Sequence, residues 1–370
     1  MEVLLEYTIM NLKKMYLDAQ DKVQEFKRAW NDVHFTNSRE KHDINVMAAH
    51  IYFYKQCNMD FRALSNFYGS YKINNPGFQN GVKAYIHESY IQKFIMDNAY
   101  FDDTFLLGVA LFYDAHNLFR DDGAREDNES LNTLLEELLD CNSLKEFSLL
   151  QGNANPGRIL IDMVSKPQLL KYMVYSVQPD LMVILQLRAL LLENIQENLK
   201  LKGIVTPREI AEEELFDRIL TIPTWKPSTR VMERFPDRSF LTELGLSEPK
   251  FTDGEWHEIL FAFSKLKQTG KMVVLVTNSA LANNPTVKIR QFLVENGNIE
   301  SIIELPDRLL ENVGIELYAV VLSHGNKGIK FLDASQAYTE QRRKKDIDVT
   351  TVLENLANPE ISRFESIESI

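Results

Sequence analysis

The fold class is decided by the stretch TDGEWHEILFAFSKLKQTGKMVVLVT, residues 252–277. Thr252 and Glu255 have the spacing of a helix capping box, and the apolar residues that follow recur at helical intervals until Gly270. The run KMVVLVT, residues 271–277, is apolar and β-branched, which predicts a buried strand. A helix that leads directly into a buried strand indicates an α/β fold, in which helices cover both faces of a mostly parallel sheet.

The same alternation extends in both directions from this stretch. Downstream, Asn284 and Pro285 predict the start of a helix that stops at Gly297. Upstream, the pattern predicts a strand, a helix and a second strand, which together form a βαβ unit. The predicted strands are residues 158–164 (RILIDMV), 180–186 (DLMVILQ), 215–221, 299–305, 317–323 and 329–333, and the predicted helices in the βαβ region are residues 168–177 and 187–201.

The amino-terminal part of the chain is predicted to be helical. Apolar residues from Leu5 to Val33 recur with alternating spacings of four and three, which indicates a helix with a narrow apolar seam. Such a seam packs against another helix, either in this chain or in a protein partner. We therefore expect a helical domain at residues 1–147, an α/β domain at 148–340, and a helical carboxy-terminal tail at 341–370.

Charge and composition limit the partners. The net charge of −12 repels a phosphate backbone, so DNA is a weakly supported partner whose contact requires a local basic patch or a second chain. The run from Arg342 to Lys345 is either such a patch or the solvated end of a helix, and the second interpretation is favoured. No segment has the length and apolarity of a membrane span, and no export signal is present, so we expect a cytoplasmic protein.

Sequence patterns for several other chemistries are absent. None of the seven histidines lies at metal-ligand spacing from another histidine or from Cys57 or Cys141, so no metal site is expected. The GxSxG, P-loop and GxGxxG patterns are also missing. These absences remove the usual hydrolase, nucleoside triphosphatase and dinucleotide-binding functions.

Four ordered motifs in the carboxy-terminal half carry a family resemblance. They are LVTNSALA (275–282), IRQFLVENGNIESIIELP (289–306), VGIEL (313–317) and FLDAS (331–335). In this order and spacing they resemble the catalytic domain of the adenine-specific DNA methyltransferases, or modification subunits, of type I restriction-modification systems. The resemblance implies a methyltransferase-like, Rossmann-type sheet, preceded here by the α-helical domain.

The resemblance also locates the position of the catalytic tetrapeptide. The family has Asn-Pro-Pro-Tyr/Phe after a strand, and the corresponding residues here are Ile222, Pro223, Thr224 and Trp225. The family's Asn accepts hydrogen bonds from the adenine amino group, while the aromatic residue stacks on the flipped base. Isoleucine accepts no hydrogen bond, so only the stacking role of Trp225 survives, and no catalytic residue is expected.

The resemblance implies an S-adenosylmethionine site that is equally altered. The family's glycine-rich turn follows its first strand, which we match to RILIDMV, so Asp162 is a remnant and Ser165 stands where glycine is expected. In the family an acidic residue accepts hydrogen bonds from both ribose hydroxyls. Gln186 stands at the matching position, and its amide cannot accept from both hydroxyls as a carboxylate does. The sequence therefore predicts no bound cofactor.

These losses predict a pseudoenzyme that keeps the methyltransferase scaffold to bind a protein partner or DNA. Two alternatives remain open at this point. One is an active S-adenosylmethionine-dependent adenine methyltransferase with diverged motifs. The other is a helical module that assembles through the seam from Leu5 to Val33.

Overall fold

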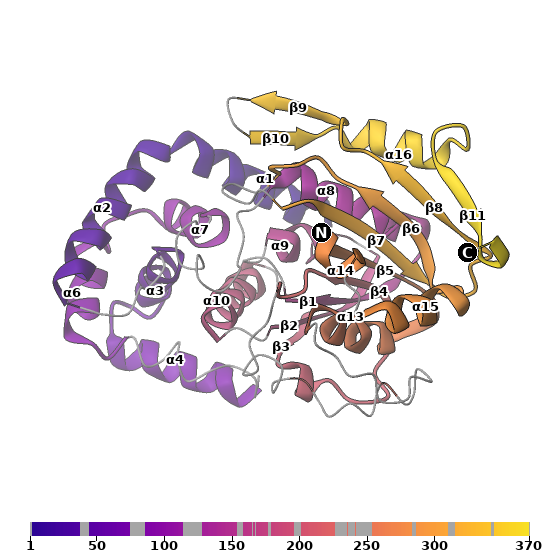
Figure 1. Cartoon of the computed structure of the whole chain (residues 1–370). Helices are drawn as coiled ribbons and strands as arrows, with labels where there is room; N and C mark the ends of the chain where they lie inside the picture. Colours follow the sequence, from indigo (N-terminus) through magenta and orange to yellow (C-terminus); the bar gives the residue numbers. More distant parts are fainter. Residues whose placement is uncertain are drawn as a thin grey trace. The chain divides into compact units, whose positions relative to one another are not determined.

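The computed structural model folds into two compact units whose segments interleave along the chain (Figure 1). The first unit comprises Met1–Ala124, Pro156–Pro167 and Gln178–Ile204, and the second comprises Arg125–Asn155, Gln168–Val177 and Val205–Ile370. The predicted domain boundaries at 147/148 and 340/341 stay a prediction. The structure describes residues 2–37, 44–74, 86–113, 128–153, 158–164, 166, 168–176, 179–195, 201–225, 235, 241, 254–282, 286–309, 315–341 and 344–369.

The described elements of the first unit are mainly helices, as predicted for the amino-terminal region. The seam helix is divided in two at Ala19, and α9 and α10 join the unit from later in the chain. The helices are α1 (Glu2–Asp18), α2 (Gln20–Asn37), α3 (Ile44–Gln56), α4 (Phe61–Asn74), α6 (Ser89–Asp97), α7 (Asp103–Phe112), α9 (Arg158–Val164) and α10 (Pro179–Ile195).

The apolar seam of α1 and α2 is covered within this unit. Its described core residues are buried, and the Phe26 ring lies 5.6 Å from Phe94 and 5.4 Å from Phe101. The Trp30 ring lies 4.9 Å from Phe94. The sequence left two possible partners for the seam, a helix of this chain or a separate subunit. For these residues the partner is in this chain, so they offer no surface to a separate subunit. The seam residues observed to be buried are Ile9, Leu12, Val23, Phe26 and Trp30.

The predicted βαβ unit at residues 158–186 is wrong, because the structure has a helix, a strand and a helix there. RILIDMV forms α9, residues 169–175 form β2 (Leu169–Tyr175), and DLMVILQ lies inside α10. Short apolar runs that are buried on all sides show no periodicity, so length must separate strand from helix. The element that contains DLMVILQ is 17 residues long, which is too long for a typical strand.

The second unit contains the sheet. Its strands follow the order β11-β8-β6-β7-β5-β4-β1-β2, and Val205 at the end of β3 (Leu201–Val205) accepts a hydrogen bond from the amide of Ser176, just past β2. Strands β2, β1, β4 and β5 are parallel, and β7 is antiparallel to both β5 and β6. The mostly parallel prediction is thus confirmed. The further bounds are β1 (Phe147–Gly152), β4 (Phe216–Thr221), β5 (Leu266–Thr277), β6 (Ile299–Glu304), β7 (Leu317–Ser323), β8 (Gly328–Asp333) and β11 (Arg363–Ser366).

The helix predicted from Thr252 ends earlier than expected. It forms α13 (Gly254–Ser264), and β5 begins at Leu266, so Gly270 lies within a strand instead of ending a helix. The amide of Phe216 donates to the carbonyl oxygen of Lys265 at 2.9 Å, which extends the pairing of β4 and β5 to this point. Pairing between strands therefore overrides the helical pattern of residues 265–269. Thr252, Asn284 and Pro285 lie outside the described residues.

The carboxy-terminal segment is not a purely helical tail. It contains the hairpin of β9 (Tyr338–Gln341) and β10 (Lys344–Ile347), then α16 (Val349–Ala357) and the edge strand β11. Lys345 of the basic run lies in β10 and not at a helix end. Its ammonium group is buried, pairs with Asp307 and lies 3.8 Å from the ring centroid of Tyr338. Side-chain packing explains this lysine, while Arg342 and Arg343 lie outside the described residues.

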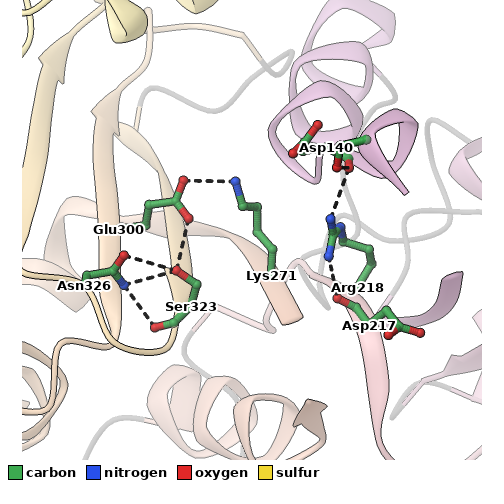
Figure 2. Close-up of polar contacts among 8 residues, drawn as sticks. Asp140, Asp217, Arg218, Lys271, Glu300, Ser323 and Asn326 are labelled. Atoms are coloured by element: carbon green, nitrogen blue, oxygen red, sulfur yellow. Dashed lines mark hydrogen bonds and ion pairs between the residues drawn. The ribbon is translucent and has the colours of Figure 1, made fainter. Parts of the chain in front are cut away.

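Charged side chains are paired where the parallel strands begin, which we call the amino edge of the sheet (Figure 2). Lys267 lies 2.9 Å from Asp217, and Lys271 lies 3.0 Å from Glu300. The Arg218 guanidinium donates to the carbonyl oxygen of Asp140, just after α8 (Glu129–Leu138), at 3.2 Å. This edge holds strands and the end of a helix together.

Candidate functional site

The sheet topology identifies the candidate site before any side chain is considered. The chain runs from β1 to β2 on one side and then to β4 on the other side of β1, so the strand order reverses between β1 and β4. Open α/β sheets bind ligands at such a switch point, outside the carboxyl ends of the strands. The residues at and after the ends of β1, β2 and β4, which we call the carboxyl edge, are therefore the candidate site.

The end of β1 is formed by buried polar residues. Gln151 accepts a hydrogen bond from the hydroxyl of Tyr172 on β2. Asn153 follows with φ of 47°, a left-handed conformation that asparagine tolerates better than most residues. This turn directs the Asn153 amide to the Thr224 hydroxyl, to which it donates at 2.5 Å. The end of β1 is thus tied by a side chain to the segment after β4.

The segment after β4 holds the predicted tetrapeptide. Ile222 is only 9% exposed, and its amide donates to the Gly152 carbonyl oxygen at 3.3 Å. Thr224 is buried too, and its amide donates to a carboxylate oxygen of Glu258 on α13 at 3.1 Å. The tetrapeptide is therefore bound on one side to β1 and on the other to α13.

A buried tyrosine packs directly against Gly152. A Cβ atom on this glycine would lie 2.2 Å from the hydroxyl oxygen of Tyr175, the neighbouring residue on β2. The Tyr175 ring makes edge contacts with Phe235 and Phe261, at centroid distances of 6.4 and 5.7 Å. Burial, and then the charge of Glu258, raises the pKa of Tyr175 well above its usual value, so the phenol stays neutral. The backbone at Gly152 is thus covered by the protein's own side chain.

Two of the three predicted cofactor positions lie on helices of the first unit. Asp162 is an exposed residue of α9, and Gln186 is a buried residue of α10. Neither lies at the end of a strand, so the matching of RILIDMV and DLMVILQ to the family's strands is wrong. Ser165 lies outside the described residues. The structure places the tetrapeptide at the carboxyl edge of the second unit, whereas Asp162 and Gln186 belong to helices of the first unit.

The sequence interpretation missed the residues that occupy the ends of β1 and β2. These are Gln151, Gly152 and Asn153 after the apolar run FSLL, and Tyr175 and Ser176 at the end of β2. A signal was present, because QGNANPG, residues 151–157, is dense in Gly, Asn and Pro, as expected of a strand end. The predicted helical region extended to residue 147, which concealed the strand that begins there.

Acidic residues lie at the same edge, at the ends of β6 and β8 and just before β7. Burial, and then the charges of Asp333 and Glu316, raises the pKa of Glu304. Glu316 is held by the side-chain amide of Asn278, which donates to it at 2.7 Å.

Within the described ranges, no group of three or more His, Cys, Asp or Glu residues is arranged to hold a metal ion. None of the helices that the structure describes has the length and apolarity to cross a membrane.

These features define the class of protein. A mostly parallel sheet with its switch point between β1 and β4, and with the antiparallel β7 between β5 and β6, is a methyltransferase-like α/β fold. Residues 183–358 match the model of the N-6 DNA Methylase family. The predicted resemblance to adenine-specific DNA methyltransferases is therefore confirmed. No curated protein sequence matches the chain.

Solved structures show the same fold at low sequence identity. The type I restriction-modification methyltransferase subunit from Streptococcus thermophilus is 15% identical, with a TM-score of 0.66 over 100% of this chain and 90% of that one. A modification subunit of a putative type I restriction enzyme from Vibrio vulnificus is 14% identical, with a TM-score of 0.54 over 77% and 67%. A putative class I S-adenosylmethionine-dependent methyltransferase from Listeria monocytogenes is 15% identical, with a TM-score of 0.53 over 85% and 96%.

Proposed function

We propose that this chain is a catalytically degenerate relative of the type I adenine methyltransferases, which uses the scaffold to bind a protein partner or DNA. One observation carries the proposal. The aliphatic Ile222 lies at the carboxyl end of β4, where the family resemblance expects the asparagine that activates adenine. An isoleucine side chain neither accepts hydrogen bonds from an amino group nor directs its lone pair at a methyl donor.

The surroundings of Ile222 support the same conclusion. Asn153 and Thr224 bond to each other across the switch point, and both are buried. A ligand at this point would have to break that bond and leave polar groups unpaired, which costs roughly 1–3 kcal/mol per group. The contacts of the carboxyl edge thus favour a closed state.

The residues present do not fit S-adenosylmethionine. The end of β2, where the family's ribose-binding acid is expected, is Tyr175 followed by the buried Ser176, and residues 169–176 contain no carboxylate. Tyr175 also covers Gly152, the glycine at the end of the first strand. These positions replace Asp162, Ser165 and Gln186 as the altered cofactor site in our proposal.

The partner part of the proposal rests on the relatives and on charge. The Streptococcus thermophilus protein is described as a methyltransferase subunit, which favours a role beside other chains. The net charge of −12 favours a protein over a phosphate backbone as the direct partner. A place beside DNA-modifying subunits agrees with the cytoplasmic location expected from the sequence.

A second candidate, an active methyltransferase with diverged motifs, is favoured by one specific observation. Asn153 brings a side-chain amide to the switch point from β1, close to Thr224 and Trp225. In this alternative, S-adenosylmethionine binds and the Asn153 carbonyl oxygen takes the role of the missing asparagine on β4.

A methyl-transfer assay separates the two candidates. The purified chain is incubated with methyl-labelled S-adenosylmethionine and unmethylated duplex DNA, with and without a type I specificity subunit. We expect no incorporation above the protein-free control. Label that depends on the chain, and that disappears in the Asn153→Ala and Pro223→Ala variants, would establish the active enzyme instead.

A further inference from the structure

The segment ISRFESI, residues 361–367, is complementary to itself when read in the opposite direction. Centred on Phe364, it places serine opposite serine, isoleucine opposite isoleucine, and Arg363 opposite Glu365. We propose that two copies of this chain associate by antiparallel pairing of their β11 strands about Phe364. This inference goes beyond the proposed function and does not depend on it.

The β11 strand lies at the edge of the sheet, outside β8 (Figure 1). It pairs with β8 in antiparallel register, with Arg363 opposite Phe331 and Phe364 opposite Lys330. The Ile367 amide donates to the Lys327 carbonyl oxygen at 3.1 Å, so the odd-numbered residues of β11 direct their backbone groups at β8. The backbone N–H and C=O of Phe364 consequently point away from the sheet, toward the position of a further strand.

The exposed side chains at and beside β11 differ from those of an edge strand that is protected against pairing. Phe364 is 58% exposed, whereas natural edge strands usually avoid large apolar groups. Ile361, in the turn before β11, is 53% exposed. The Arg363 side chain is 76% exposed and forms an ion pair with Glu365 on the same face of the strand. The edge therefore offers both apolar surface and opposite charges to a partner strand.

A two-fold axis through Phe364 satisfies all of these groups at once. The Phe364 N–H of each copy donates to the Phe364 carbonyl oxygen of the other, which gives two backbone hydrogen bonds at the centre. Arg363 faces Glu365 of the second copy, and the same pair recurs on the other side of the axis. Opposite charges and aromatic pairs directly across a strand pair are stabilising, and an interface of this kind is closed by its symmetry.

The expected strength follows from the small size of the contact. The four residues of β11 from each copy bury less than the roughly 1,200–2,000 Å² of a standard stable interface. We therefore expect a dimer in concentration-dependent exchange, with a dissociation constant on the order of 10 µM.

Sedimentation velocity of the full chain, at concentrations from about 1 to about 200 µM, tests the proposal. The wild type should shift from monomer to dimer across this range. R363E and E365R should each weaken self-association by about tenfold or more, because each places like charges opposite one another. The double variant R363E/E365R should restore it, because the charges are again complementary.

Two controls make the result specific. E354R, a charge reversal on the exposed side of α16, should leave the association unchanged. F364P removes the outward N–H but no donor to β8, so it should weaken the dimer while circular dichroism shows a folded chain. A wild type that stays monomeric throughout, a dimer that tolerates R363E, or a folded double variant without restored association would each overturn the proposal.

Discussion

The two edges of the sheet are held together by different kinds of side-chain contact. At the amino edge, half-buried charged groups pair across strands. Lys267 pairs with Asp217, and Lys271 pairs with Glu300 (Figure 2). At the switch point of the carboxyl edge, two neutral buried side chains, those of Asn153 and Thr224, bind each other. Ligand sites in this class of fold lie at the carboxyl edge, so the comparison shows that buried side chains of the protein bind one another at the edge where a ligand is expected.

The energetic consequence is an unequal distribution of stability. Exposed ion pairs contribute little because water and salt screen them, whereas an unsatisfied buried group carries its full desolvation penalty. Substitutions at the carboxyl edge should therefore cost more than those at the amino edge. The following predictions can break or sharpen this comparison.

The largest effect is expected for Gly152→Ala. The new methyl group would lie 2.2 Å from the hydroxyl oxygen of Tyr175, a rigid and fully buried ring, so the variant should lose about 3 kcal/mol of unfolding free energy. Gly325→Ala is the matched control, because its φ is +78° but no atom lies within 4 Å of the added carbon. The control should lose about 1 kcal/mol. Urea unfolding measures both, and equal losses would show that Gly152 is not sterically closed.

A smaller loss is expected at Asn153. Asn153→Ala removes the bond to Thr224 and places alanine at a φ of 47°, which together should cost about 2 kcal/mol. Asn153→Gly removes only the bond and should cost about 1 kcal/mol. A double-mutant cycle with Thr224→Val should give a coupling of about 1 kcal/mol. No measurable coupling would mean that the two ends of β1 and β4 are not tied in solution.

The amino edge should show a pH dependence that Asp217 dominates. Burial alone would raise the pKa of Asp217, but hydrogen bonds from Ser148 and Lys267 more than offset it, and the pKa is lowered. A lowered carboxyl pKa gives stability that is complete above the unfolded pKa of about 3.9 and is lost as pH falls through the folded value. Asp217→Asn should flatten the unfolding free energy between about pH 5 and pH 2 and cost about 1 kcal/mol at pH 7. An unchanged pH profile would remove Asp217 from this role.

The smallest effect is expected for Lys271→Met. Its pair with Glu300 spans 3.0 Å at a partly exposed position, so the loss should be about 0.5 kcal/mol and should vanish in 1 M salt. Thr224→Val is the comparison at the carboxyl edge, and its cost should not depend on salt. A salt-independent loss at Lys271 would contradict the proposed difference between the two edges.

The sequence predicted one half of the fold better than the other for a physical reason. The strands at 216–221, 299–304 and 317–323 match their predicted ranges within a residue, because β-branched runs there are bounded by polar or turn-forming residues. In α9 and α10 the apolar residues are buried on every side, so no periodicity distinguishes helix from strand. The helix predicted at 168–177 failed for the opposite reason, since β2 is fixed by pairing with β1, which the sequence pattern did not reveal.

The residues of the candidate site were also predicted to different extents, and for the same reason. Ile222 to Trp225 could be located, because they follow the correctly predicted strand β4. The positions on β1 and β2 could not be located. The sequence interpretation assigned the first two strands to residues 158–164 and 180–186, which form α9 and part of α10. A residue at a strand end can be assigned only when that strand is assigned correctly, so Gly152, Asn153, Tyr175 and Ser176 emerged from the structure alone.

The central claim is that the carboxyl edge is closed to the methyl donor, and calorimetric titration of the full chain with S-adenosylmethionine tests it most directly. We predict no binding heat up to a ligand concentration of about 1 mM, which corresponds to a binding free energy weaker than about −4 kcal/mol. Saturable binding in the micromolar range, abolished in the Gly152→Ala variant, would contradict the account.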